Sequence, residues 1–110
     1  MKIVTAVVHP SMLNKVTDAL QEIENFPGMT ISDVRGFGRR NISEEAAAPL
    51  QEFIEKIRLE IVASDVMVEV IVGTIVRAAH TGRHGDGKVF VWPVEEAVRI
   101  RNGELNDSAL

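Results

Sequence analysis

The sequence contains no cysteine, which excludes disulfide bonds, thiolate metal sites and cysteine nucleophiles. It also lacks any apolar run as long as a membrane span, and no signal-peptide pattern opens the chain, so we expect a cytoplasmic protein. Positive charge is scarce: the formal net charge of −4 argues against a nucleic-acid partner held by phosphate contacts. The remaining composition is that of an ordinary globular chain, and residues 1–110 are expected to form a single domain.

The spacing of apolar residues predicts elements in the order β-α-β-β-α-β. Residues 56–62 show the clearest alternation, with apolar side chains on one face and charged ones on the other. Ser11 and Asp65 are the expected N-caps of the two helices, and Pro27 with Gly28 is expected to end the first helix. The expected strands cover residues 2–9, 29–34, 56–62 and 88–92, and the expected helices cover residues 12–26 and 66–80.

That order is typical of an α+β, ferredoxin-like fold, in which two helices cover one face of a four-stranded antiparallel sheet. The opposite face would carry apolar side chains together with the charged row Lys56, Arg58 and Glu60. Self-association is the simplest explanation for a sheet face of that mixed character, so a homo-oligomer is expected. Residues 41–52 are interpreted as an exposed excursion with a short helical turn, and residues 102–110 as a polar tail.

The stretch from Thr81 to Lys88 concentrates glycine between the second helix and the last strand. Its glycines, Gly82, Gly85 and Gly87, surround Asp86 and precede Lys88. Closely spaced glycines let main-chain N–H groups turn toward an anion, and a neighbouring lysine adds a full positive charge. The pattern therefore favours a phosphate-binding loop over residues 81–88, although an ordinary turn between a helix and a strand has the same composition.

A second glycine-bearing segment, residues 35–40, has two glycines that flank Phe37 and arginines at both ends. Those glycines would let the main chain approach a flat ring or a phosphate, and the alternative is a β-bulge beside a core phenylalanine. More than half of the basic residues gather in such short pieces, which favours a small anionic ligand over a long polyanion. They are Arg35, Arg39 and Arg40, then Arg83 and Lys88, then Arg99 and Arg101.

Taken together, these segments resemble the PII signal-transduction family over almost the whole chain. The residues that carry the resemblance are 29–30, 34–39, 56–62, 78–82, 85–91, 93–101 and 103–104. The resemblance implies a compact homotrimer of ferredoxin-like subunits, with three sites for ATP, ADP or AMP in the clefts between neighbours. Such a protein would be a non-enzymatic sensor whose nucleotide occupancy orders or releases a partner-binding segment, the T-loop, here residues 40–55.

The resemblance also implies roles for individual residues. The phosphates would be held by Gly85, Asp86, Gly87 and Lys88, with Arg99 and Arg101 reaching across the subunit interface and Arg39 adding another cation. The adenine pocket would be lined by Thr30, Gly36, Gly38 and Val62.

The T-loop departs from the family pattern. Arg40 stands where the family usually has a glutamine that helps to hold Mg²⁺ and 2-oxoglutarate, and a guanidinium has no acceptor for a metal. Arg40 could still attract a phosphate or an anionic effector, and whether Mg²⁺ accompanies the nucleotide is left open. The chain has no tyrosine, so modification of a T-loop tyrosine is impossible.

Residues 25–30 resemble PII-like proteins associated with heavy-metal efflux pumps, and other members of this broader class act near bicarbonate transport. A membrane transporter is therefore the expected partner.

Three alternatives remain beside the transporter-linked sensor. One is a nitrogen regulator that responds to 2-oxoglutarate. Another is an enzyme that uses Asp86, Lys88 and His84 for phosphoryl chemistry, although no paired carboxylates or nucleophile–base spacing accompany them. The last is a metal-responsive binding module, for which the candidate ligands beyond carboxylates are His9, Met12, His80 and His84.

Overall fold

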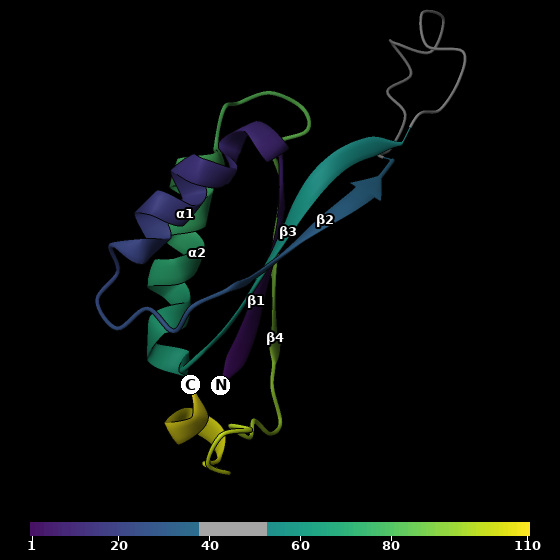
Figure 1. The fold of residues 1–110 in the computed structure, drawn as a ribbon. Coiled ribbons are helices and arrows are strands. Elements are labelled where there is room, and N and C mark those ends of the chain that lie inside the picture. The colour runs from purple at the N-terminus through teal and green to yellow at the C-terminus, as the bar shows by residue number, and fades with distance from the viewer. Residues whose placement is uncertain (38–52) are drawn as a thin grey trace, which may run out of the picture.

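The computed structural model describes residues 1–37 and 53–110 and confirms the expected α+β, ferredoxin-like fold (Figure 1). Within this part of the chain no helix is both long enough and apolar enough to cross a bilayer. The T-loop residues 40–52, with the short helical turn expected over 41–52, lie outside the described residues. The strands are β1 (Lys2–Val8), β2 (Thr30–Gly36), β3 (Ile54–Ala63) and β4 (Gly87–Pro93), the helices are α1 (Leu13–Gln21) and α2 (Asp65–Ala79), and short 3-10 helices are η1 (Pro10–Met12) and η3 (Asn106–Ala109).

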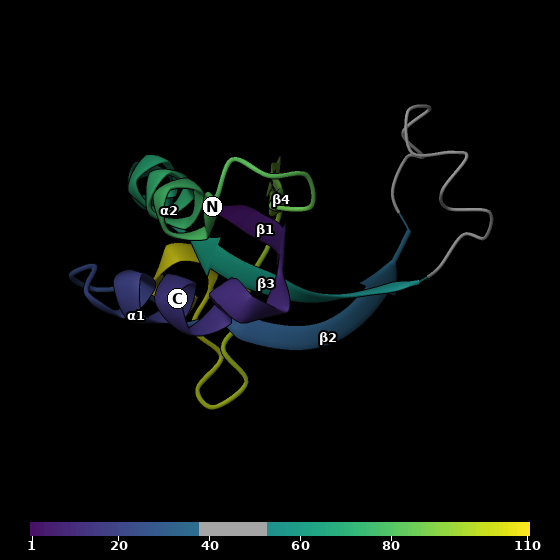
Figure 2. The same ribbon diagram turned by 90° about the horizontal axis from the view of Figure 1, so that it is seen from above.

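The strands form one antiparallel sheet in the order β2-β3-β1-β4. Both helices pack against the same face of this sheet, and the other face is uncovered by any described element (Figures 1 and 2). β1 is central because it pairs with β3 on one side and with β4 on the other along its whole length. The edges of the sheet are therefore β2 and β4, which lie on opposite sides of the subunit.

The core lies between the helices and the covered face of the sheet. Alternate residues of β3 are buried there, which confirms the two-residue periodicity seen in the sequence. Apolar residues at helical spacing in α1 and α2 complete this core. The fully buried apolar side chains include Val4 and Ala6 of β1, Leu59, Ile61 and Ala63 of β3, Val16 and Leu20 of α1, and Ile71 of α2.

Both expected N-caps are wrong. The Nδ1 atom of His9 accepts a hydrogen bond from the Ser11 N–H at 3.1 Å, so His9 caps η1 and α1 begins only at Leu13. Ser64, with an extended backbone, precedes α2, and Asp65 is its first helical residue. The Asp65 carboxylate instead accepts hydrogen bonds from the Met1 α-amino group at 2.9 Å and from Lys2 Nζ at 3.2 Å.

Two other boundaries also differ from expectation. α1 ends at Gln21, five residues before Phe26, because turns over residues 22–26 replace its last expected turn. Residues 102–110, expected as a polar tail, form an ordered segment. Val98 pairs with Leu105, the Asn106 N–H donates to the Ala97 oxygen at 2.7 Å, and η3 follows. These hydrogen bonds fold the segment back along the molecule, which its polar composition alone did not reveal.

The uncovered sheet face carries both apolar and charged groups. Phe90 and Trp92 of β4 are about half exposed on it. Thr5 of β1 is only 6% exposed, yet its hydroxyl has no hydrogen-bond partner among the described residues. Arg58 and Glu60 of β3 form an ion pair at 3.4 Å on the same face. A buried hydroxyl without a partner is costly, and so this face has the character of a surface that another chain covers.

Gly87, the first residue of β4, lies very close to β1, and a substitution at this position can test how much the fold depends on that approach. Its φ is +107°, and a Cβ there would overlap the main-chain oxygen of Val7. We expect Gly87→Ala to destabilise the fold by more than Gly28→Ala, measured by urea unfolding. Gly28 also has a positive φ, +98°, but open space around it, so its replacement carries only backbone strain of about 1–3 kcal/mol. Equal losses in the two variants would show that the contact with Val7 is unimportant.

Candidate functional site

The loop between α2 and β4 is closed by the carboxylate of Asp86. It accepts hydrogen bonds from the Thr81 N–H at 2.8 Å, from the Gly82 N–H at 2.9 Å and from the Thr81 hydroxyl. The Thr81 side chain is the main cause of a lowered pKa for Asp86, about 2, and the main-chain N–H groups and nearby His80 lower it further. The Asp86 carboxylate is therefore ionised, and its hydrogen bonds hold residues 81–86 in one turn.

This turn leaves main-chain donors available. The amides of His84, Gly85 and Asp86 donate no hydrogen bond within the described part of the chain. Positive φ angles at Gly82, Gly85 and Gly87 give the backbone its shape here, and those conformations are strained for other residues. Consecutive free amides in such a turn can attract an anion. Phosphate binding by residues 81–88 stays a prediction.

Lys56 of β3 is an unpredicted part of this loop. Its Nζ donates a hydrogen bond to the Gly85 oxygen at 2.6 Å and so ties the loop to the neighbouring strand. Sequence reasoning placed Lys56 only in the charged row of the open face. The register of the sheet could have predicted this contact. β1 lies between β3 and β4, and it ends beside Lys56 on one side and Gly85 on the other. Lys56 adds a second cation beside Lys88 at this end of the molecule.

A groove of about 590 Å³ lies elsewhere, along β2, β3 and the chain's last residues. Thr30 and Val62, both expected to contact adenine, line it. Glu60 faces it as well, and Ala109 and Leu110 form part of its wall, which the sequence did not predict. The groove therefore presents both apolar and polar surface.

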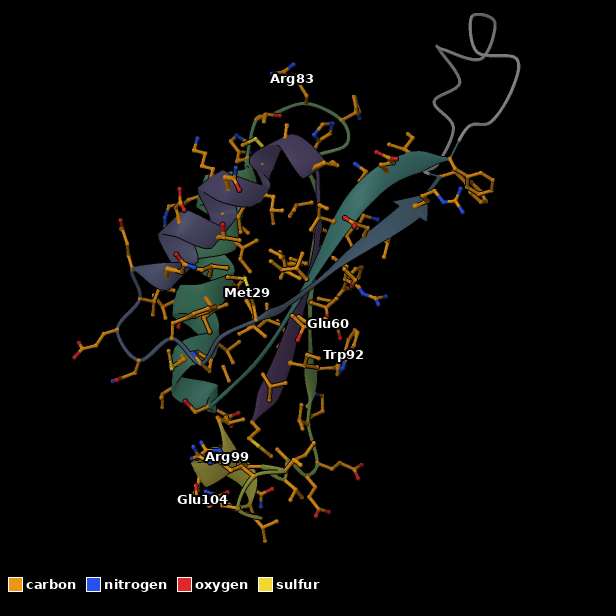
Figure 3. All side chains as sticks on the ribbon, in the orientation of Figure 1. Met29, Glu60, Arg83, Trp92, Arg99 and Glu104 are labelled. Atoms are coloured by element: carbon orange, nitrogen blue, oxygen red, sulfur yellow. The ribbon has the colours of Figure 1, made fainter. Side chains whose placement is uncertain are left out.

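Arg99 stands near this groove but is bound to its own chain. One terminal nitrogen of its guanidinium, Nη1, lies 3.3 Å from the Glu104 carboxylate, and the other, Nη2, donates to the Leu110 main-chain oxygen at 3.1 Å. Arg101 is exposed, and no hydrogen bond or ion pair of its side chain occurs among the described residues. Figure 3 shows Arg99 and Glu104 side by side at one end of the molecule and Arg83 at the other.

A single subunit does not bring the expected site residues together. Gly36 and Thr30 are the two ends of β2, roughly 20 Å apart along the strand. Lys88 pairs with Val7 and Val62 with Ile3, so the phosphate loop and the groove also lie on opposite sides of β1. One group contains Gly85 to Lys88, and the other contains Thr30, Val62, Arg99 and Arg101. Gly36 stands apart from both, because it ends β2 far from Thr30 and lies on the sheet edge opposite β4. Gly38, Arg39 and Arg40 lie outside the described residues.

The residues proposed for catalysis or metal binding find no support here. The Asp86 carboxylate already accepts several internal hydrogen bonds, so it is poorly suited to act as a general base. The His9 ring contacts Ser11, and His80 lies 3.9 Å from Asp86. No group of three histidine, aspartate or glutamate side chains that could hold a metal occurs in residues 1–37 and 53–110.

The fold is that of a small ferredoxin-like subunit. A family profile described as "Nitrogen regulatory protein P-II" matches residues 1–104, and the chain belongs to this P-II family. Relatives include proteins named "Nitrogen regulatory protein P-II" from Azospirillum brasilense and Klebsiella oxytoca, and "Nitrogen regulatory protein P-II 1" from Escherichia coli K12. Each is 42% identical to this chain over the whole length of both proteins. Proteins of this family are non-enzymatic regulators, so the expected family and regulatory role are confirmed.

The pKa of Asp86 provides a test of the loop geometry. Because the folded value, about 2, is below the ordinary value of 3.8, the carboxylate's contribution to loop stability is complete above about pH 4 and is lost as the pH falls through 2. An NMR titration of the Asp86 carboxyl carbon is expected to have its midpoint near 2. Thr81→Val, which removes the hydroxyl donor, is expected to move that midpoint upward. A midpoint at 3.8 in the unaltered protein would contradict the observed hydrogen bonds.

Proposed function

We propose that this protein is a homotrimeric sensor that binds an adenine nucleotide at each cleft between neighbouring subunits. The observation that carries this proposal is the separation of the two half-sites within one chain. Head-to-tail contacts between subunits close into a ring, and in such a ring one edge of a subunit meets the opposite edge of the next. The β4 edge with its phosphate loop would then face the neighbour's groove beside β2, and each cleft would contain both halves.

The uncovered sheet face supports the same assembly. Its half-exposed aromatic residues, Phe90 and Trp92, and the unpartnered hydroxyl of Thr5 are what a subunit interface would cover. Burying this face toward the centre of a trimer would leave the edges β2 and β4 free to form the clefts.

Within each cleft, different residues would bind the phosphates and the adenine. Lys88 and the free amides of residues 84–86 would hold the phosphates, and the groove lined by Thr30 and Val62 would take the adenine. By the family resemblance, Gly36, Gly38, Arg39, Arg40, Arg99 and Arg101 would complete the site. The Asp86 carboxylate is engaged within its loop, so among the described residues of this loop none offers a free carboxylate to Mg²⁺.

The output of the sensor would be the segment that follows β2. Gly36 ends that strand. By the family resemblance it would belong to the nucleotide site, so the ligand would contact the chain at the point where this segment begins. At its base, Phe37 and Phe53 pack edge to face at 5.6 Å, and Arg35 lies 5.9 Å from the Phe53 ring. A nucleotide that binds one arrangement of residues 40–55 more tightly would shift the population toward it. The partner proposed for that segment is a membrane transporter.

A nitrogen regulator that responds to 2-oxoglutarate is the second candidate. The names of the relatives from three bacteria favour it, since all are nitrogen regulatory proteins. Arg40 argues for a changed response, because a guanidinium cannot ligate a metal that bridges to an oxoacid. Binding of 2-oxoglutarate in the presence of ATP and Mg²⁺ would favour this candidate over the transporter-linked sensor.

Nucleotide binding can be measured by isothermal titration calorimetry with ATP, ADP and AMP. We expect binding, and we expect Lys88→Ala to weaken ATP about tenfold or more, because a hydrogen bond to a charged phosphate is lost. Lys15→Ala, at an exposed position on α1, changes the net charge equally and should leave affinity unchanged. No binding heat for any of the three nucleotides would remove the proposal.

The shared cleft can be tested by mixing two inactive variants. Lys88→Ala damages one half-site and Arg101→Ala damages the other, so each variant alone should bind ATP poorly. If a site contains residues from two subunits, mixed trimers will include clefts with both residues intact. Unfolding and refolding the variants together should therefore restore part of the ATP binding. The same weak binding before and after mixing would place both residues in one subunit's site.

A further inference from the structure

The 104–110 segment contacts both the groove and the arginine beside it. Leu110 and Ala109 form part of the groove wall opposite Thr30, and Leu110 also borders a second hollow lined by Phe26, Ser64 and Met67. The same segment supplies both acceptors of the Arg99 guanidinium. It thus occupies the region in which the base and the phosphates of a nucleotide would come close to one another.

The segment is held in this place by main-chain geometry. The Arg99 N–H donates to the Glu104 oxygen at 2.8 Å, and the Gly103 N–H donates to the Arg99 oxygen at 2.7 Å. Asn106 has a positive φ of 56° and accepts from the Ala97 N–H at 3.3 Å through its side chain. These contacts place Glu104 directly against Arg99, so the ion pair follows from the turn itself.

From this arrangement we infer that the 104–110 segment is an internal competitor for Arg99, and that Glu104 weakens binding of those nucleotides whose phosphates must reach this arginine. The inference rests on the proposed nucleotide site. The Arg99 side chain is only 31% exposed, and the two terminal nitrogens of its guanidinium are already directed to Glu104 and Leu110. A phosphate can bind Arg99 only if it replaces these acceptors, and it must also approach the like charge of Glu104.

The exchange is feasible because each present contact is a single long hydrogen bond. The contact with Glu104 is 3.3 Å and the contact with Leu110 is 3.1 Å, and the Glu104 side chain is about half exposed. A phosphate forms shorter, charge-assisted hydrogen bonds with a guanidinium, often two at once. A ligand with a longer phosphate chain would therefore open the contact, whereas a ligand whose phosphates stop short of Arg99 would leave it closed. Glu104 would in this way help the site to distinguish nucleotides by the length of their phosphate chains.

The test measures ATP and adenosine affinity of the full-length protein by calorimetry. Glu104→Gln is expected to tighten ATP binding by up to about fivefold, the effect of one exposed ion pair. Adenosine, which has no phosphate, should bind equally to both proteins. Glu95→Gln is the matched control, because Glu95 is exposed and has no ion pair among the described residues, yet the charge change is the same. It should leave both affinities unchanged.

Hydrogen exchange gives a second readout. Saturating ATP is expected to speed exchange of the Asn106 and Leu110 amides, since the segment is displaced. Unchanged or weaker ATP binding in Glu104→Gln, or slower exchange with ATP, would overturn the inference. These results are distinct from failure of the proposed function, which would be the absence of any ATP binding in the unaltered protein.

Discussion

The pairing of β1 with both β3 and β4 is the constraint on which the other features depend. It fixes the register of three strands at once, so a residue at one end of β4 cannot approach the far end of β3. Because Gly87 must lie against Val7, the phosphate loop is anchored to the end of this central strand. The groove beside Thr30 is held near the other end of β1, where Ile3 lines it. The antiparallel ladder therefore keeps the two groups of proposed site residues apart, and the proposed nucleotide site would need a neighbouring subunit to join them.

In each group of proposed site residues, the ligand-binding atoms are held in place by other residues of the same chain. Asp86 uses its charge to close the loop and thereby frees the amides of residues 84–86, and Lys56 holds the Gly85 oxygen. Arg99, by contrast, is held by contacts within its own chain. The two ends of the proposed site would differ in this respect: the loop would be open to a ligand from the outset, and Arg99 would first have to lose its internal acceptors.

Much of this arrangement could be predicted from the sequence. Two-residue alternation identified β3 and its buried face, and the clustered glycines of residues 82–87 identified the loop. The helix starts were missed because His9 and Asp65 make contacts that composition does not reveal: one is a ring nitrogen that acts as a cap, and the other pairs with the chain's first residues. The fold of residues 102–110 depends on hydrogen bonds to Ala97 and Arg99, which no local pattern specifies.

The account rests on a nucleotide site that exists only between subunits. Native mass spectrometry of the protein with ATP tests this directly, because it reports ligand number and assembly state together. The account predicts trimers that carry up to three ATP molecules and monomers that carry none. Monomers that retain ATP, or an assembly that is not a trimer, would contradict it.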